Sequence, residues 1–377
     1  METSLAASLL AAAVAVTALA AAPGGTVAAS PKHHKKCRKG QKRIRGKCRL
    51  KPRKISRFGA MIADAADQAR LDRLHALGTN RVRLVARLDM APNSRITDAI
   101  AQGFEVLTTA TNGAFPAAPP TDLADYQARL ARELVAHPTP LVSIENEPTA
   151  DRYYTGTPAQ YLTELAAAVP VAHAHGAKIS DGGLVSTGVQ LATWYDLWTS
   201  SGCAVADHYA AVAFPGSRTA ELISDLPSCA EPGHPILGGT PKALEVMNDT
   251  LELIAGFRSI PIDYVNFHWY QSTPEAMRTT VEYLRRATGK QVITNEIGQF
   301  DDSPDTVRAL LDETAQLHLP WVVWFASDGS GAVGMFNADN SIRPNGLAFR
   351  DFVQRCDGRI NCGRDKRKKH RHKRHHR

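Results

Sequence analysis

The feature that most constrains the fold is a regular alternation of short apolar segments with longer amphipathic ones along the middle of the chain. Most of the apolar segments are rich in Val, Ile and aromatic residues and lack polar alternation, which is typical of strands that are buried on both faces. Strands are predicted over residues 58–63, 81–88, 104–110, 141–146, 178–183, 262–270, 291–296 and 320–326.

Amphipathic segments between these strands predict helices over residues 65–77, 93–102, 122–136, 158–175, 241–258, 274–288, 304–318 and 345–355. Four of them begin with a Thr or Ser followed by a Pro, as in Thr157-Pro158 and Ser303-Pro304. The hydroxyl accepts a hydrogen bond from a free amide, and proline lacks the amide that would have no partner. Eight strand–helix units predict an α/β fold, a (β/α)8 TIM barrel. A doubly wound open sheet is the alternative.

One strand–helix unit is longer than the others, because an insertion after strand 5 runs from Leu184 to Thr240 and holds Trp194 and Trp198. We expect it to form a wall of the cleft, pinned by a disulfide; a surface excursion without function is the alternative. Six cysteines fit an exported protein. The pairing with the shortest loops joins Cys37 to Cys48, Cys203 to Cys229 and Cys356 to Cys362.

The two ends of the chain differ from its body. Residues 5–22 are almost wholly apolar, and Val27-Ala28-Ala29 places small residues before Ser30, so residues 1–29 are predicted to be a secretory signal peptide. An uncleaved anchor helix is the alternative reading of that run. Residues 30–55 are then a basic, disulfide-looped arm, 56–356 the barrel domain and 357–377 a basic tail. Both arms are expected to be disordered.

The net charge of +8 is concentrated in those arms. Residues 31–54 carry 13 Lys and Arg with no acid, and residues 363–377 carry 9 with one acid, so the rest of the chain has a net charge of −13. An acidic body argues against a nucleic-acid groove. The basic tails fit an anionic cell-envelope polymer as partner. We expect a secreted or cell-surface protein with no transmembrane span once the signal is removed.

Two of the predicted strands end in glutamate. The segment 142–148 reads Val-Ser-Ile-Glu-Asn-Glu-Pro, and the segment 291–298 carries Glu296 at the end of its apolar run. A charge at the end of a buried strand is costly unless the site is polar, and in a TIM barrel the strand ends open onto one active face. Paired carboxyls there suit glycosidic bond hydrolysis, in which one protonates the leaving oxygen and the other attacks the anomeric carbon or activates water. Glu145 is expected on the opposite face of its strand.

These motifs resemble the retaining glycoside hydrolases of clan A, and they are similar to families five, thirty-nine and one hundred and twenty-eight over roughly residues 58–355. The resemblance implies that Glu147 is the acid/base and Glu296 the nucleophile, with Asn146 bound to the sugar 2-hydroxyl. The two carboxyl groups are then expected about 5–5.5 Å apart, the separation of retaining enzymes.

Four further positions match the same group of enzymes. Arg83, in the second strand, would hold the nucleophile ionised. His268 and Tyr270 resemble the His-x-Tyr of family five, in which the tyrosine contacts the nucleophile. Trp324 resembles the tryptophan that forms the floor under the reacting sugar. Cross-barrel pairing for Arg83 and core burial for His268 and Trp324 are the structural alternatives.

The resemblance leaves the family and the substrate open. Strand 3 ends in Thr108-Thr109-Ala110-Thr111-Asn112, without the histidine often seen there in family five. No cofactor and no metal are expected. The glycine pattern at 329–334 has no helix after it, so it is interpreted as a loop and not as a dinucleotide site. The functional alternative is a non-catalytic carbohydrate- or cell-envelope-binding protein on the same barrel.

Overall fold

A computed structural model describes residues 41–44, 47–50, 56–62, 68–214, 241–271, 273–326 and 334–356, with the backbone alone for 41–50, Pro241 and Cys356. Contacts divide the chain into two units, residues 1–53 and 54–377. In the first unit, β1 (Gln41–Ile44) and β2 (Lys47–Leu50) form an antiparallel pair. The expectation of a disordered arm is wrong for these residues, whose backbones form a two-stranded ladder.

The predicted signal peptide, most of the basic arm and the C-terminal tail lie outside the described residues. Cys37, Cys229 and Cys362 lie outside them too, so the disulfide pairings stay predictions. None of the described helices has the length and apolar character that a membrane span requires.

The second unit is built on a closed barrel of parallel strands in the order β10-β3-β4-β5-β6-β7-β8-β9. Pairing of β10 with β3 closes the sheet, which confirms the predicted TIM barrel and excludes the open doubly wound sheet. Each strand overlaps a predicted one. Their bounds are β3 (Phe58–Met61), β4 (Arg81–Arg87), β5 (Glu105–Thr111), β6 (Leu141–Ile144), β7 (Lys178–Ser180), β8 (Tyr264–Trp269), β9 (Gln291–Ile297) and β10 (Val322–Trp324).

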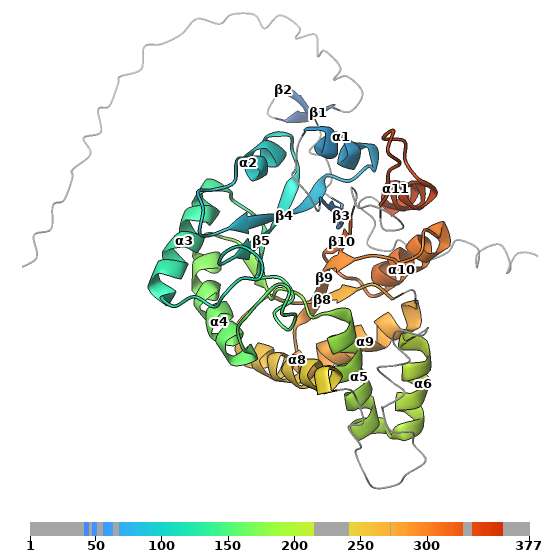
Figure 1. Cartoon of the computed structure of the whole chain (residues 1–377). Helices are drawn as coiled ribbons and strands as arrows, with labels where there is room; N and C mark the ends of the chain where they lie inside the picture. The colour runs from blue at the N-terminus through green and yellow to red at the C-terminus, as the bar shows by residue number, and fades with distance from the viewer. Residues whose placement is uncertain are drawn as a thin grey trace, which may run out of the picture. The chain divides into compact units, whose positions relative to one another are not determined.

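Helices form a layer outside the strands, as Figure 1 shows. They are α1 (Gln68–Ala76), α2 (Ser94–Ala101), α3 (Leu123–Ala136), α4 (Pro158–Ala174), α8 (Pro241–Ser259), α9 (Pro274–Thr288), α10 (Pro304–Gln316) and α11 (Pro344–Cys356). Thr157 forms a capping box with Gln160, and the Ser303 side chain accepts from two amides of the first turn of α10. Thr273 precedes α9 without a side-chain cap.

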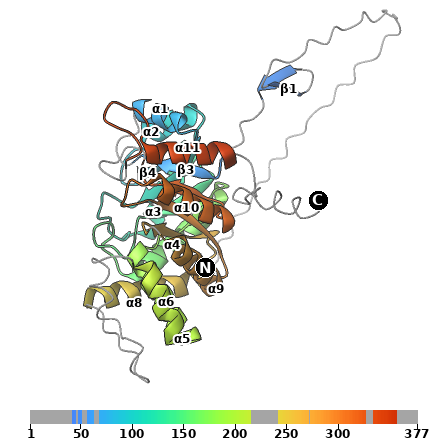
Figure 2. The same cartoon turned by 90° about the vertical axis from the view of Figure 1, so that its right-hand side faces the viewer.

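The described part of the insertion after β7 forms two helices that the sequence did not predict, α5 (Ser186–Ser201) and α6 (Cys203–Ala213). Figures 1 and 2 show both helices beside α8 and α9; α5 contacts α8, α9 and strand β8, and α6 contacts α5 and α9. Tyr209 of α6 bonds Thr280 of α9 at 2.7 Å, and Ser186 at the start of α5 donates to the His268 carbonyl at 3.0 Å. The expected cleft wall stays a prediction, because residues 215–240 of the insertion lie outside the described residues. Seven consecutive residues of α5, from Gly188 to Trp194, are buried, which removes the one-sided apolar stripe by which helices are recognised.

A buried acidic cluster lies behind the end of β6. Glu145 and Glu164 of α4 are at most 1% exposed, and each carboxyl group has one oxygen without a hydrogen-bond partner. Glu145 accepts from the Asn112 amide at 2.5 Å, and Glu164 accepts from the Tyr154 hydroxyl at 3.0 Å. Burial raises the pKa of Glu164 to about 7, and burial together with the charge of Glu164 raises the pKa of Glu145 well above its usual value. Both groups therefore hold their protons in mildly acidic solution.

This cluster makes the stability pH-dependent. Between pH 4.5, the ordinary pKa of glutamate, and about 7, the folded chain keeps a proton on Glu164 that the unfolded chain releases, so the free energy of unfolding falls as the pH rises. Glu164→Gln cannot bind this proton, so its free energy of unfolding lacks this decrease of roughly 3 kcal/mol. The stability of the variant relative to the wild type therefore increases as the pH rises. Urea unfolding at several pH values checks this, with the exposed Glu245→Gln as control. A wild-type-to-variant difference that is constant with pH would contradict it.

Candidate active site

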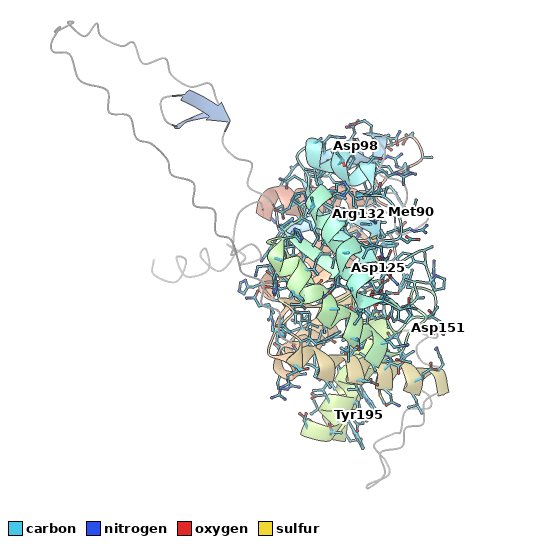
Figure 3. The ribbon with its side chains drawn as sticks, turned by 90° about the vertical axis from the view of Figure 1, so that its left-hand side faces the viewer. Met90, Asp98, Asp125, Arg132, Asp151 and Tyr195 are labelled. Carbon is cyan, nitrogen blue, oxygen red and sulfur yellow. The ribbon has the colours of Figure 1, made fainter. Side chains whose placement is uncertain are left out.

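The two glutamates predicted to act together meet at the carboxyl ends of the barrel strands. Glu147 lies just after the end of β6, and Glu296 is the residue before the last one of β9. One carboxylate oxygen of each and a ring nitrogen of His268 all lie within 4.8 Å of one another. Met90 and Asp151, from the loops after β4 and β6, mark this edge of the barrel in Figure 3. The barrel thus brings together two carboxyl groups that are far apart in sequence.

Glu296 is surrounded by hydrogen-bond donors. Arg83 Nη1 donates to its Oε2 at 2.5 Å, and the Tyr270 hydroxyl donates to its Oε1 at 2.5 Å. Burial alone would raise the pKa of Glu296, but the positive charges of His268 and Arg83 and the two hydrogen bonds outweigh it, so this pKa is lowered. Glu296 is therefore ionised at neutral pH. Burial and the charge of Glu296 raise the pKa of Tyr270, which keeps its hydroxyl protonated as a donor.

Arg83 also positions Asn146. Its Nη2 donates to Asn146 Oδ1 at 2.5 Å, and its Nε donates to Thr109 Oγ1 at 2.9 Å. With the guanidinium only 1% exposed, these bonds fix it between β4, β5, β6 and β9. Because the carbonyl of Asn146 accepts from Arg83, the amide NH2 group of Asn146 is the one left to donate toward a ligand.

His268 links Glu147 to a polar chain inside the barrel. Its Nδ1 lies 2.7 Å from Glu147 Oε1, and its Nε2 lies 2.8 Å from Asn295 Oδ1. Asn295 Nδ2 donates to Ser143 Oγ at 3.1 Å, and Ser143 in turn donates to the Asp181 carbonyl at 2.7 Å. This chain orients the Asn295 amide with its oxygen toward the imidazole, so Nε2 of His268 carries a hydrogen.

A protonated His268 donates from Nδ1 to Glu147 Oε1. Burial would lower the pKa of His268, but the charge of Glu296, 3.8 Å away, and the hydrogen bond to Glu147 outweigh it, and the pKa of His268 is raised. A protonated imidazole beside Glu147 is thus a proton store next to one carboxyl, while the other carboxyl is kept ionised.

A β-bulge explains why Asn295 and Glu296, neighbours in sequence, both face the interior. Asn266 pairs with Ile293, but His268 pairs with Glu296, so three residues of β9 span two of β8. The same offset recurs against β10. A bulge breaks strict alternation, and the sequence analysis assigned no role to Asn295. Its position directly before the glutamate was the only signal of its role.

The backbone around Glu147 is held in an uncommon conformation. Glu145 and Glu147 have φ of 60° and 44°, in the left-handed region that non-glycine residues rarely adopt and that clusters at functional sites. The Glu147 amide donates to the Gly182 carbonyl at 3.2 Å. The neighbouring Gly183 has φ of 94°, and a Cβ there would lie 2.2 Å from His268 Nε2, so only glycine leaves room for the imidazole. Glu145 points away from the mouth, as expected.

Trp324 does not lie with the other six predicted residues. Its side chain is 0% exposed and packs on Phe349 of α11, 6.3 Å between ring centroids, in the core between strands and helices. It cannot be the floor under a sugar there. Alternation along β10 turns the residue before it, Val323, to the barrel interior. The aromatic residue that reaches the site is the next one, Phe325, which contacts Tyr270 edge to face at 5.7 Å.

Glu147, His268 and Glu296 are also, within the described part of the chain, the one cluster with metal-ligand character. Arg83 already neutralises Glu296, and His268 Nδ1 is engaged by Glu147, so a cation would have to displace both contacts. The residues therefore fit a proton-transfer site better than a metal site, and the expected lack of a metal stays a prediction.

No known protein-family model matches this chain, and no curated protein sequence matches it. Among solved structures it is similar to a GH128 (subgroup II) endo-beta-1,3-glucanase from Sorangium cellulosum, with a TM-score of 0.48 and 14% identity over 78% of this chain and 97% of that chain. A GH128 (subgroup I) endo-beta-1,3-glucanase from Amycolatopsis mediterranei gives 0.44 and 11% over 78% and 97%. A family 30 subfamily 8 xylanase, Xyn30A, from Clostridium acetobutylicum gives 0.45 and 15% over 79% and 70%.

These neighbours are glycoside hydrolases, and family 128 is among the three families that the sequence motifs resemble. The chemistry of the site is derived from this chain's own residues.

The proton shared by Glu147 and His268 is directly measurable. Glu147→Gln removes the acceptor that favours the charged imidazole, so we expect the pKa of His268 to fall by roughly one unit. Imidazole NMR shifts recorded against pH check this, with the exposed Glu245→Gln as control. An unchanged His268 pKa in Glu147→Gln, with Nε2 still protonated, would show that Glu147 does not share the proton.

Proposed function

We propose that this protein is a retaining glycoside hydrolase that cleaves O-glycosidic bonds of a polysaccharide or glycan by double displacement. The observation that carries the proposal is the meeting of Glu147 and Glu296, whose nearest oxygens lie within 4.8 Å, with partners that ionise one and supply a proton to the other. A separation of about 5–5.5 Å between carboxyl groups is typical of retaining enzymes, whereas inverting enzymes need about 6.5–9.5 Å to admit a water molecule.

In the first step, the ionised Glu296 attacks the anomeric carbon and forms a glycosyl ester as the bond to the leaving oxygen breaks. Glu147 gives that oxygen the proton it shares with His268. The Arg83 and Tyr270 bonds orient the Glu296 carboxylate. Asn146, fixed by Arg83, is placed to donate its amide to the sugar 2-hydroxyl.

In the second step, water attacks the anomeric carbon and releases Glu296. Glu147, now without its proton, takes one from the water, which restores the single shared proton of the Glu147–His268 pair. Formation of the ester has removed the negative charge of Glu296, one of the causes that raise the pKa of His268. The imidazole then holds a proton less strongly. The Glu147–His268 pair is therefore free to act as the base that takes a proton from the attacking water.

The proposal extends to location. The apolar N-terminal segment and the basic ends are the observations behind a secreted or cell-surface enzyme held by an anionic cell-envelope polymer. Release of the protein from cells by salt, lost on deletion of residues 357–377, is the measurement; retention that is unaffected by salt would rule this part out.

The nucleophile assignment predicts that Glu296→Ala loses activity by about four orders of magnitude or more on any glycoside that the wild type hydrolyses, because no covalent intermediate can form. The wild type should release product with the anomeric configuration of the substrate, as seen by NMR early in the reaction. Aryl glycosides and a polysaccharide panel serve as substrates, and a chelator should leave the rate unchanged. Full activity in Glu296→Ala, or an inverted product, would refute the mechanism.

Glu147→Ala is the matched companion variant. Only poor leaving groups need protonation, so its rate should fall far more on alkyl or sugar leaving groups than on nitrophenol. An equal loss on both would argue against the acid role. A wild type that binds a polysaccharide yet hydrolyses nothing in the panel would instead favour the non-catalytic binding protein.

A further inference from the structure

Two aromatic pairs stand at the mouth of the barrel, and of their four rings only that of Tyr270 takes part in the proposed chemistry. We infer that Phe300–Tyr270 and Phe115–Tyr153 are sugar-binding platforms on opposite sides of the carboxylates. The ligand is then a glycan chain bound on both sides of the cleaved bond. This inference rests on the proposed function for the identity of the cleaved bond, but the binding itself can be tested without catalysis.

The first platform lies beside Glu296. Phe300, in the loop after β9, is 68% exposed, and its ring stacks on that of Tyr270 with 5.5 Å between centroids and 25° between planes. Tyr270 is held by its hydrogen bond to Glu296 and by its edge-to-face contact with Phe325. One face of an exposed aromatic ring is therefore supported by a side chain that touches the proposed nucleophile.

The second platform lies on the Glu147 side. Phe115, in the loop after β5, is 42% exposed and packs edge to face on Tyr153, 5.3 Å between centroids. Burial and the charges of Glu147 and Glu296 raise the pKa of Tyr153. The Ala117 amide donates to the Tyr153 carbonyl at 2.8 Å, so the two loops that carry this pair are joined by their backbones.

The strand order puts the two platforms across the mouth from each other. In the closed barrel, β5 and β6 are separated from β9 by several strands in either direction. Phe115 and Phe300 are also the only aromatic side chains among the large hydrophobic residues that are exposed in the described ranges. A single exposed apolar residue needs no explanation, but two aromatic rings that flank a polar catalytic centre do.

A pyranose ring has an apolar face of C–H groups that packs against an aromatic ring and covers surface that water otherwise contacts. Its hydroxyl groups project from the ring edge toward polar side chains and solvent. A chain of sugars laid across the mouth therefore covers both rings while one linkage lies between Glu147 and Glu296. A small aryl glycoside fills the centre and at most one platform.

The experiment compares Phe115→Ala, Phe300→Ala and their double variant with Val135→Ala. Val135 is 68% exposed, like Phe300. It lies at the C-terminal end of α3, away from the carboxyl ends of the barrel strands. Binding of soluble β-1,3-glucan, xylan and mixed-linkage glucan is measured by affinity electrophoresis and calorimetry in a Glu296→Gln background. In parallel, kcat/KM is measured in active protein on oligosaccharides of increasing length and on aryl monosaccharides.

We expect each phenylalanine variant to weaken binding of the recognised polysaccharide by roughly two- to tenfold, with the double variant weakest. The gain of kcat/KM with chain length should be lost, while hydrolysis of the aryl monosaccharide should fall by less than that of the longest oligosaccharide. Val135→Ala should match the parent. Circular dichroism confirms that each variant is folded.

Equal polysaccharide affinity in the double variant and in Val135→Ala would overturn the inference, as would a loss of the same size on aryl monosaccharides. Hydrolysis of aryl glycosides without any binding of polysaccharide would also overturn it and leave the proposed function standing. Polysaccharide binding that depends on both phenylalanines, without hydrolysis of any substrate, would support the platforms and reject the glycosidase.

Discussion

The bonds that Arg83 makes inside the barrel are the constraint on which the rest of the site depends. One buried guanidinium binds Glu296 and Asn146 at 2.5 Å each and Thr109 at 2.9 Å. Burial of a carboxylate away from water costs several kcal/mol, and only a well-placed partner compensates for this cost. The ion pair is thus less a source of stability than the condition under which Glu296 can exist as an anion in a buried site.

The same geometry gives the two carboxyl groups different chemistry. Glu296 has two strong donors and two neighbouring positive charges, so its pKa is lowered. Glu147 contacts instead the imidazole of His268, whose pKa is raised. A proton on that imidazole therefore lies next to the Glu147 carboxyl group. A pair of titratable groups whose surroundings differ in this way is the arrangement by which one site supplies an acid and a nucleophile together.

Most of the architecture followed from the sequence, because buried parallel strands and capped amphipathic helices leave strong periodic signals. The Thr-Pro and Ser-Pro starts located helices such as α4 and α10 closely. The prediction failed where periodicity carries no information: α5 is buried along seven consecutive residues, polar Gln190 and Thr193 among them, so apolar residues do not mark one side of the helix. The hairpin β1–β2 lies in a basic arm whose composition indicated disorder.

Within the site, the glutamates, Arg83, Asn146, His268 and Tyr270 could be placed together once the barrel was assumed. The errors come from single-residue geometry that alternation does not encode. The bulge in β9 turns Asn295 inward beside Glu296, and β10 turns Trp324 outward so that Phe325 meets Tyr270. The positive φ angles at Glu145 and Glu147, which send one carboxyl behind the strand and the other into the mouth, likewise have no sequence signature.

The central claim is that Glu296 becomes covalently bound to the sugar, and trapping that intermediate tests it most directly. Incubation with a series of 2-deoxy-2-fluoro glycosyl fluorides, followed by proteolysis and mass spectrometry, locates the labelled residue. The account predicts one sugar per chain, on the peptide that contains Glu296, and none in Glu296→Gln. A label on Glu147 or Glu145, or turnover of the fluorides without any covalent adduct, would contradict it.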